Sequence, residues 1–137
     1  MANPLTVANR TWTYADLLKL PEEQRCEIID GEYFDMTPAP NRLHQEILGN
    51  LFRQIINQLD GKPCKVYFAP FDVRLPDSDD QPDGEIRNVV QPDLVVICDE
   101  KKLDDRGCRG APDLAVEILS PSTAGKDQVK KRRLYER

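Results

Sequence analysis

Two acidic residues lie in or beside runs of strand-forming residues. Asp93 precedes the apolar run of "QPDLVVI", and Glu117 lies within "DLAVEIL". Side chains alternate along a strand, so Asp113, Ala115, Glu117 and Leu119 are predicted to share one face. A carboxylate inside an apolar strand is unfavourable unless it is paired, protonated or bound to a metal. Glu117 is therefore the first candidate functional residue.

Each acid also has a structural explanation. A Pro-Asp pair at a strand entrance is commonly a turn, and Glu117 could form an ion pair with a lysine or arginine. If the two strands are neighbours, however, Asp93 and Glu117 converge at one end of the sheet. Their hard oxygen ligands suit Mg²⁺ or Mn²⁺. Such an ion polarises a phosphodiester and lowers the pKa of an attacking water, and a nearby lysine would stabilise developing negative charge.

The composition predicts one folded domain. The chain has 137 residues, of which 39% are apolar and 31% are charged, an ordinary balance for a globular protein. No apolar run approaches the length of a membrane-spanning helix, and the start lacks the basic and apolar regions of a signal peptide. We therefore expect a cytoplasmic protein.

The charge is unevenly distributed. The net charge is −5, yet "KDQVKKRRLYER" at the end carries six basic and two acidic side chains. An acidic protein is a poor general binder of nucleic acid, because phosphate neutralisation supplies most non-specific affinity. The basic run is explained either as a solvated helix face or as a local contact with a nucleic-acid backbone.

The four cysteines are scattered and form no CxxC motif. In a chain without a secretory signal, they are predicted to be reduced and mostly structural. His44 is the only histidine, which argues against a zinc site.

Hydrophobic periodicity and turn residues predict the order helix, hairpin, helix, three strands, helix. The strongest helix pattern covers residues 42–59, where Leu43, Ile47, Leu51, Ile55 and Leu59 recur every four residues. The other predicted elements are a short helix capped by Thr13, a hairpin that turns at Asp30-Gly31, a strand or bent strand pair over 65–75, strands over 89–98 and 113–119, and a final helix capped by "SPST". The last two strands are apolar on both faces, which is typical of the middle of a sheet.

The order and spacing of these segments resemble the PD-(D/E)XK nuclease superfamily and, more closely, the Uma-type family of putative restriction endonucleases. The matching segments are "CEIIDGE", "TPAPNRLHQEILGNL", "VYFAPFDVRL", "VVQPDLVVI", "GAPDLAVEILSPST" and "KDQVKKRRLYER". The resemblance implies an α/β (α+β) fold with a mixed central sheet flanked by helices, preceded by a helix and a β-hairpin. It also implies that residues 1–137 are a single nuclease-like domain without the family's C-terminal strand. Asp93 matches the first acid of the motif and Glu117 the second.

The motif lysine is displaced in this sequence. Its usual position, two residues after the second acid, is occupied by Leu119. The Uma-type pattern instead places a spaced D…K…Y in the next helix, matched here by Asp127, Lys131 and Tyr135. Lys131 is therefore the candidate catalytic lysine, with Lys126 and Lys130 as alternatives and a solvated helix face as the competing explanation.

The resemblance also implies roles for residues near the start of the chain. His44 matches a histidine of the family pattern, as a catalytic residue or as a packing or capping residue of its helix. Glu46 is a candidate third metal ligand beside Asp93 and Glu117, and Glu27 also matches the family, with a structural role open to it.

The leading hypothesis is a Mg²⁺- or Mn²⁺-dependent endonuclease that hydrolyses phosphodiester bonds in DNA. The alternative is a catalytically inactive nuclease-fold module that binds nucleic acid or protein, and a third possibility is an inactive, degraded or truncated product. An open sheet edge would favour a homodimer.

Overall fold

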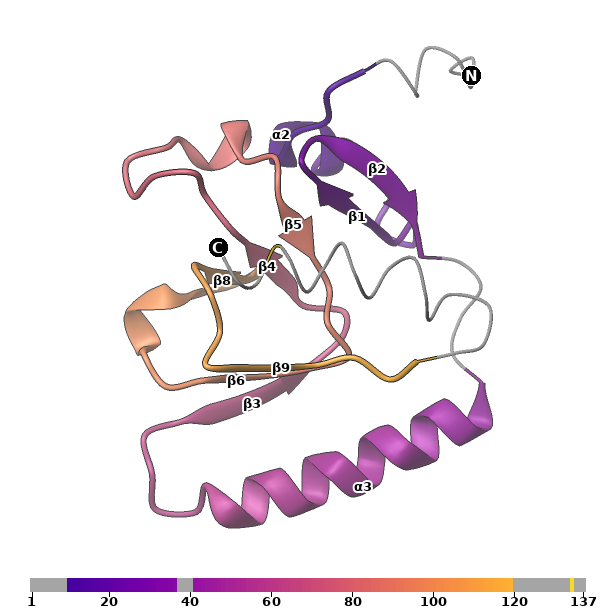
Figure 1. Cartoon of the computed structure of the whole chain (residues 1–137), viewed down its shortest axis with the longest axis vertical. Coiled ribbons are helices and arrows are strands. Elements are labelled where there is room, and N and C mark those ends of the chain that lie inside the picture. The colour runs from indigo at the N-terminus through magenta and orange to yellow at the C-terminus, as the bar shows by residue number, and fades with distance from the viewer. Residues whose placement is uncertain (1–9, 37–40, 120–133, 135–137) are drawn as a thin grey trace.

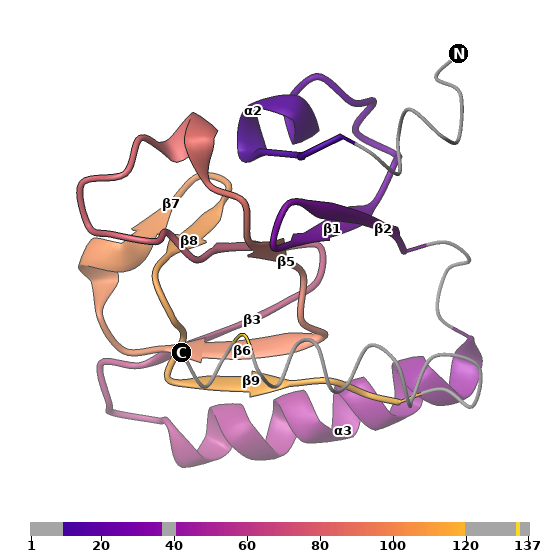
Figure 2. The same cartoon turned by 45° about the horizontal axis from the view of Figure 1, so that its top comes forward.

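The strands of this protein form two sheets, and the long helix α3 covers the outer face of the smaller one (Figures 1 and 2). The computed structural model describes residues 10–36, 41–119 and 134. The α+β class and the mixed sheet predicted from the sequence are confirmed. The elements are α2 (Tyr14–Leu17), β1 (Cys26–Ile29), β2 (Glu32–Asp35), α3 (Arg42–Gln58), β3 (Lys65–Phe68), β4 (Asp72–Arg74), η1 (Asp83–Glu85), β5 (Val89–Val90), β6 (Leu94–Ile97), η2 (Glu100–Lys102), β7 (Leu103–Asp104), β8 (Gly107–Arg109) and β9 (Leu114–Val116).

The larger sheet is mixed and the smaller is antiparallel. The six-stranded sheet has the order β2-β1-β5-β4-β8-β7, in which β4 and β8 are parallel. The three-stranded sheet has the order β3-β6-β9, with both pairs antiparallel. β6 is therefore central, as predicted, whereas β9 is an edge strand among the described residues. Within the part of the chain that the structure describes, β6 meets the expectation of a central strand and β9 does not.

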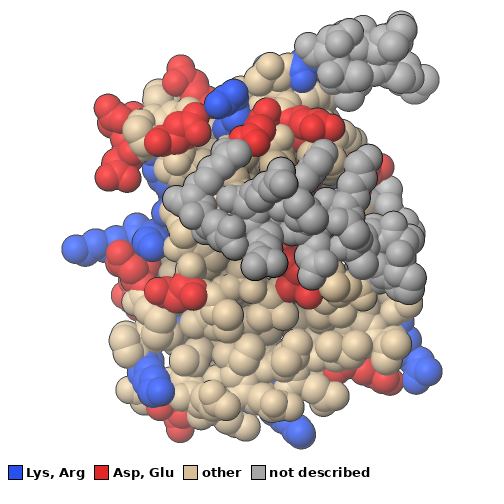
Figure 3. All heavy atoms as spheres, viewed as in Figure 1, with Lys and Arg blue, Asp and Glu red and all other residues tan. Residues whose placement is uncertain are grey.

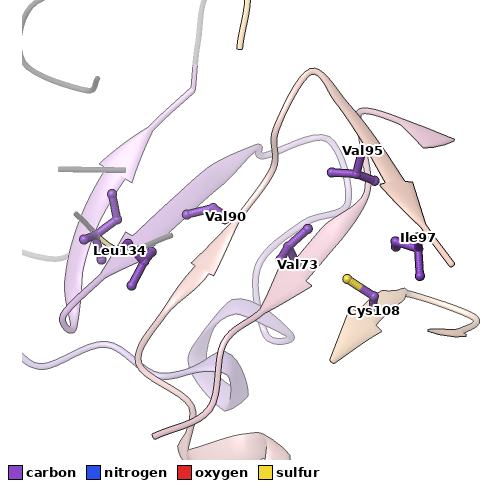
Figure 4. Close-up of a cluster of buried hydrophobic side chains, with 7 residues drawn as sticks. Val73, Val90, Val95, Ile97, Cys108 and Leu134 are labelled. Atoms are coloured by element: carbon purple, nitrogen blue, oxygen red, sulfur yellow. The ribbon is translucent and has the colours of Figure 1, made fainter. Parts of the chain in front are cut away.

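The core lies between the two sheets. Val73 and Val90 come from the larger sheet, Val95 and Ile97 from the smaller, and all four are almost fully buried. Leu134 joins this cluster and is 5% exposed, although it comes from the far end of the chain (Figure 4). Leu134 therefore belongs to the same buried cluster as residues of both sheets.

Helix α3 confirms the helix predicted from the four-residue repeat. Its N-cap is Asn41, whose side chain accepts a hydrogen bond from the backbone of His44 at 2.9 Å. Phe52 packs edge-to-face on Phe68 of β3, with ring centroids 5.4 Å apart. None of the helix residues is fully buried, because the helix contacts a sheet on one side only. Within the described residues, no helix has the length and apolar character needed to cross a membrane.

The predicted hairpin is confirmed as β1 and β2. Asp30 and Gly31 form its turn with φ angles of 51° and 80°, the conformation that two-residue hairpin turns require. A side chain at position 31 would also approach Thr11, whose Cγ2 lies 2.7 Å from the ideal Cβ position. Both the positive φ angle and the close approach of Thr11 therefore favour glycine at position 31.

Two predicted strands are each divided between the sheets. Residues 65–75 form the bent pair β3 and β4, with a cis peptide between Ala69 and Pro70. Residues 89–98, predicted as one strand, form β5 in the larger sheet and β6 in the smaller. The break falls at Pro92, which has no N–H to continue a ladder.

The hairpin of β7 and β8 was not predicted, and it is fixed by a buried arginine. Arg74 is 2% exposed. Its guanidinium donates to Asp83 at 2.7 Å, to the carbonyl oxygen of Cys108 at 3.2 Å, and to Asp104. Burial opposes ionisation of Asp104, but hydrogen bonds from Arg74 and the backbone hold its pKa below the ordinary value. Arg74 thus ties β4 to the η1 loop and to the β7–β8 hairpin.

The prediction that all four cysteines are reduced is wrong. Cys64 and Cys98 form a disulfide, while Cys26 and Cys108 are free and buried. β3 pairs with β6 so that Lys65 faces Ile97, and continuing this register by one residue places Cys64 opposite Cys98. A separation of 34 residues hides this proximity in the sequence.

We expect reduction of this disulfide to destabilise the protein. The bridge joins residues 34 apart, and chain entropy then predicts a loss of about 3–4 kcal/mol in the free energy of unfolding. Urea unfolding with and without dithiothreitol measures the loss. A Cys64→Ala/Cys98→Ala double variant is the control, because the reductant should not change its midpoint. Finding four reactive thiols in the denatured, unreduced protein would contradict the assignment.

Candidate active site

Asp93 and Glu117 lie opposite each other on neighbouring strands. In the pairing of β6 with β9, Leu94 faces Val116 and Val95 faces Ala115. Continuing the register by one residue places Asp93 opposite Glu117. Paired residues of antiparallel strands point to the same face, which here is the face of Val95 that looks into the core between the sheets. The structure therefore brings these two predicted residues together, at the end of β6 where the chain enters the sheet.

The aspartates of the two Pro-Asp pairs accept backbone hydrogen bonds at the two ends of the β6–β9 ladder. Asp93 Oδ2 accepts a hydrogen bond from the backbone N–H of Ile118 at 2.7 Å. Asp113 Oδ2 accepts one from the N–H of Cys98, also at 2.7 Å. Each aspartate thus caps the partner strand just beyond its last residue. These capping bonds give both aspartates a structural role, and they use one carboxylate oxygen of each.

His44 contacts the other carboxylate oxygen of Asp93. Its Nε2 lies 3.0 Å from Asp93 Oδ1, and both side chains are 16% exposed. Its Nδ1 is buried and has no hydrogen-bond partner among the described residues. The backbone N–H of His44 is held by the N-cap Asn41, so the first turn of α3 sets the position of the imidazole. The histidine is thus in contact with the first motif acid.

Glu46 is not brought into this group. It is exposed on α3 and pairs with Arg42 at 3.1 Å, one helical turn earlier. Residues 10–36, 41–119 and 134 contain no group of three or more His, Cys, Asp or Glu side chains that could hold a metal ion. Of the three predicted ligands, Asp93 and Glu117 lie at the same end of the β6–β9 ladder, and Glu46 is engaged elsewhere. Two carboxylates suit Mg²⁺, which commonly binds one or two and completes its octahedron with water and substrate oxygens.

Sequence reasoning missed the groups that hold the chain just before Asp93. Glu27 is 5% exposed, and its Oε2 accepts the backbone N–H of Gln91 at 2.8 Å. The side chain of Gln91 donates to Asp72 Oδ1 at 2.8 Å. Asp72 in turn accepts from the hydroxyl of Tyr14 at 3.2 Å. In the sequence, Glu27 was singled out only by its place in the family pattern. The signal that could have pointed to its buried role was the presence of a charged residue in the apolar strand "CEII".

Burial and charge keep the hydroxyl of Tyr14 protonated. Burial, and next the negative charge of Asp72, raise the pKa of Tyr14 to about 12. Its hydroxyl therefore remains a donor to Asp72 throughout the neutral range.

The candidate lysines lie outside the described residues. These are Lys126, Lys130 and Lys131, together with the Asp127 and Tyr135 of the same pattern. Leu134, three residues beyond Lys131, is described, and it is buried in the core cluster that contains Val90. At the position of the ordinary motif lysine, Leu119 is 49% exposed.

Acidic side chains gather over the loop before η1, which carries the exposed residues Asp77, Asp79 and Asp80 (Figure 3).

The fold has a counterpart among solved structures. A crystal structure described as a putative nuclease belonging to DUF820, from Anabaena variabilis, superimposes with a TM-score of 0.64 at 23% sequence identity. The match covers 90% of this chain and 66% of that one. The fold is thus that of a protein described as a nuclease.

This chain belongs to the Uma2 family, described as putative restriction endonucleases, whose model matches residues 13–137. It is also 28% identical over 114 residues to an uncharacterised protein, slr1290, of Synechocystis sp.. That match covers 83% of this chain and 55% of the relative, so the chain spans about half the length of this curated relative. The resemblance noted in the sequence is therefore confirmed at the level of family and fold.

Proposed function

We propose that this protein is a metal-dependent endonuclease that hydrolyses phosphodiester bonds in DNA. The observation that carries the proposal is the placement of Asp93 opposite Glu117 on adjacent strands, with His44 against Asp93. The family supports nuclease activity, and the carboxylate pair supports the choice of Mg²⁺ or Mn²⁺. A homodimer stays a prediction.

Each residue has a defined task in the proposed reaction. Asp93 and Glu117 would hold the ion, which would supply Lewis-acid polarisation of the phosphate and a lowered pKa for water. His44 and the N–H of Ile118 fix the two oxygens of Asp93, so the carboxylate is oriented before substrate arrives. Water would add to phosphorus and release a proton to solvent, the ester P–O bond would break, and the leaving oxygen would take up a proton from solvent, while Lys131 would stabilise the charge that develops on the phosphate oxygens.

The test is cleavage of supercoiled plasmid by the purified chain with Mg²⁺ or Mn²⁺, compared with EDTA and with an RNA substrate. Metal-dependent nicking of DNA supports the proposal. Absence of cleavage under all metal conditions, in a folded protein that binds Mn²⁺, supports instead the non-catalytic module. That second function is favoured by Leu119 at the usual lysine position and by the engagement of both Asp93 oxygens within the protein.

We expect Lys131→Ala to lower the rate of DNA cleavage by roughly 10²–10³-fold, the loss typical for one group that stabilises transition-state charge. Its affinity for Mn²⁺, measured by calorimetry, should change by no more than about twofold, because an ammonium group is not a metal ligand. Lys62→Ala, on the exposed turn after α3, is the control and should cleave normally. Unchanged cleavage in Lys131→Ala would move the role to Lys126 or Lys130, or away from this segment.

A further inference from the structure

The residues Gln91, Pro92 and Asp93 connect the two sheets. The chain leaves the six-stranded sheet at Val90 and enters the three-stranded sheet at Leu94. Pro92 is fully buried in this link. Because so short a link has little freedom, the position of Asp93 depends directly on how Gln91 is held.

Gln91 is held through its backbone by Glu27. Its N–H would be a partly buried donor without a ladder partner, because β5 ends at Val90, and such a donor is unfavourable unless it is satisfied. Glu27 Oε2 accepts it at 2.8 Å. Glu27 belongs to β1, where the adjacent Ile28 pairs with Val89. A carboxylate from the larger sheet thus fixes the point at which the chain departs toward the site.

Gln91 is also held through its side chain. The amide nitrogen donates to Asp72 Oδ1 at 2.8 Å, and the amide oxygen accepts from Arg25 Nε at 3.3 Å. Asp72 is itself fixed by Tyr14. On the other side of the link, the carbonyl oxygen of Asp93 accepts the N–H of Ala69 at 3.1 Å. The link is therefore fixed at both ends, and the carboxylate of the buried Glu27 bonds to it two residues before Asp93.

We propose that Glu27 is a positioning residue that sets where the Asp93 carboxylate meets Glu117. This proposal rests on the proposed metal site, but it makes a separate claim about the geometry of Asp93. Glu27 acts through the Gln91 N–H and the rigid link, and it does not hold the ion. A purely structural role in β1 would affect stability alone, whereas a positioning role also affects the groups that contact Asp93.

The test compares three variants of Glu27 with one matched control. Glu27→Ala removes the acceptor, Glu27→Asp withdraws the carboxylate by one carbon–carbon bond, and Glu27→Gln retains an acceptor oxygen for the Gln91 N–H. Ile28→Ala is the control. Ile28 is fully buried on the same strand, and none of the hydrogen bonds described above joins it to Gln91. All four are first shown to be folded, and Glu27→Asp carries the test if Glu27→Ala fails to fold.

The first measurement is Mn²⁺ affinity. We expect Glu27→Ala to weaken binding by about 10–100-fold, as residues that orient metal ligands do, and Glu27→Asp to weaken it by at least about threefold. Glu27→Gln should restore most of the affinity, and Ile28→Ala should leave it unchanged. Wild-type affinity in both Glu27→Ala and Glu27→Asp would overturn the proposal.

The second measurement does not need a metal. The N–H of Ile118 donates to Asp93 Oδ2, so its amide resonance reports the position of that carboxylate. We expect a larger shift of the Ile118 resonance in Glu27→Ala or Glu27→Asp than in Ile28→Ala. If the wild type binds no Mn²⁺, the proposed metal site fails, and this resonance alone decides the positioning role. An Ile118 resonance that moves no more than in Ile28→Ala would then overturn it.

Discussion

Glu117→Gln is expected to weaken Mn²⁺ binding by more than about a hundredfold, effectively abolishing it at micromolar protein. The substitution keeps the shape of the side chain but replaces an anionic ligand by a neutral amide, and hard divalent cations depend on carboxylate charge. Asp93 would remain as the one described carboxylate at this end of the ladder. Isothermal titration with MnCl₂ of wild type and variant measures the difference.

Glu117 is a better choice than Asp93 for this experiment. Asp93 also caps the N–H of Ile118 and contacts His44, so its removal would alter the ladder as well as the metal site. Glu117 lies just after β9 and is half-buried, and glutamine keeps the length and shape of its side chain, so the urea midpoint of Glu117→Gln should stay close to that of wild type.

Asp113→Asn is the matched control for the metal experiment. Asp113 belongs to the second Pro-Asp pair and caps the opposite end of the same ladder through the Cys98 N–H. Its replacement should leave Mn²⁺ affinity unchanged. Equal Mn²⁺ affinity in Glu117→Gln and wild type would show that Glu117 is not a ligand, and a wild type that binds no Mn²⁺ would refute the metal site in this chain.

Local signals in the sequence were sufficient for the elements that depend on local chemistry. The four-residue repeat that includes Leu51 and Ile55 predicted α3, and Asp30-Gly31 predicted the turn between β1 and β2, because periodicity and φ preference act over a few residues. The convergence of Asp93 and Glu117 could be predicted only on the condition that their strands are neighbours. The pairing of β6 with β9 satisfies that condition.

The features that sequence reasoning missed depend on contacts between distant residues. Glu27 and Gln91 are 64 residues apart and Tyr14 and Asp72 are 58 apart. A charged residue in a strand gives no indication of its partner. Neither the hydrogen bonds that hold Gln91 nor the burial of Glu27 could therefore be derived from the sequence. The division of residues 89–98 did leave a signal, since Pro92 interrupts the run, but the apolar residues on both sides favoured one continuous strand.

Arg74→Met is expected to lower the free energy of unfolding by about 2–4 kcal/mol. Arg74 is 2% exposed and makes hydrogen bonds to two carboxylates and one carbonyl oxygen, and each hydrogen bond to a charged group contributes roughly 1.5–3 kcal/mol. The full sum is not expected, because the side chains of Asp83 and Asp104 are 42% and 46% exposed and regain hydration when the guanidinium is removed. Methionine fills much of the same volume, so the loss reports the polar contacts rather than a cavity.

Urea unfolding of Arg74→Met is best compared with Arg87→Met. Arg87 is 45% exposed and pairs with Asp77 at 3.5 Å, so its replacement should change stability by less than about 1 kcal/mol, as for other exposed ion pairs. The Arg74 contacts join β4 to η1 and to the β7–β8 hairpin, whereas Asp93 lies at the other sheet. Arg74→Met should therefore bind Mn²⁺ as wild type does at temperatures where it is folded. A stability loss no larger than that of Arg87→Met would show that the buried guanidinium contributes little to joining β4 to η1 and to the β7–β8 hairpin.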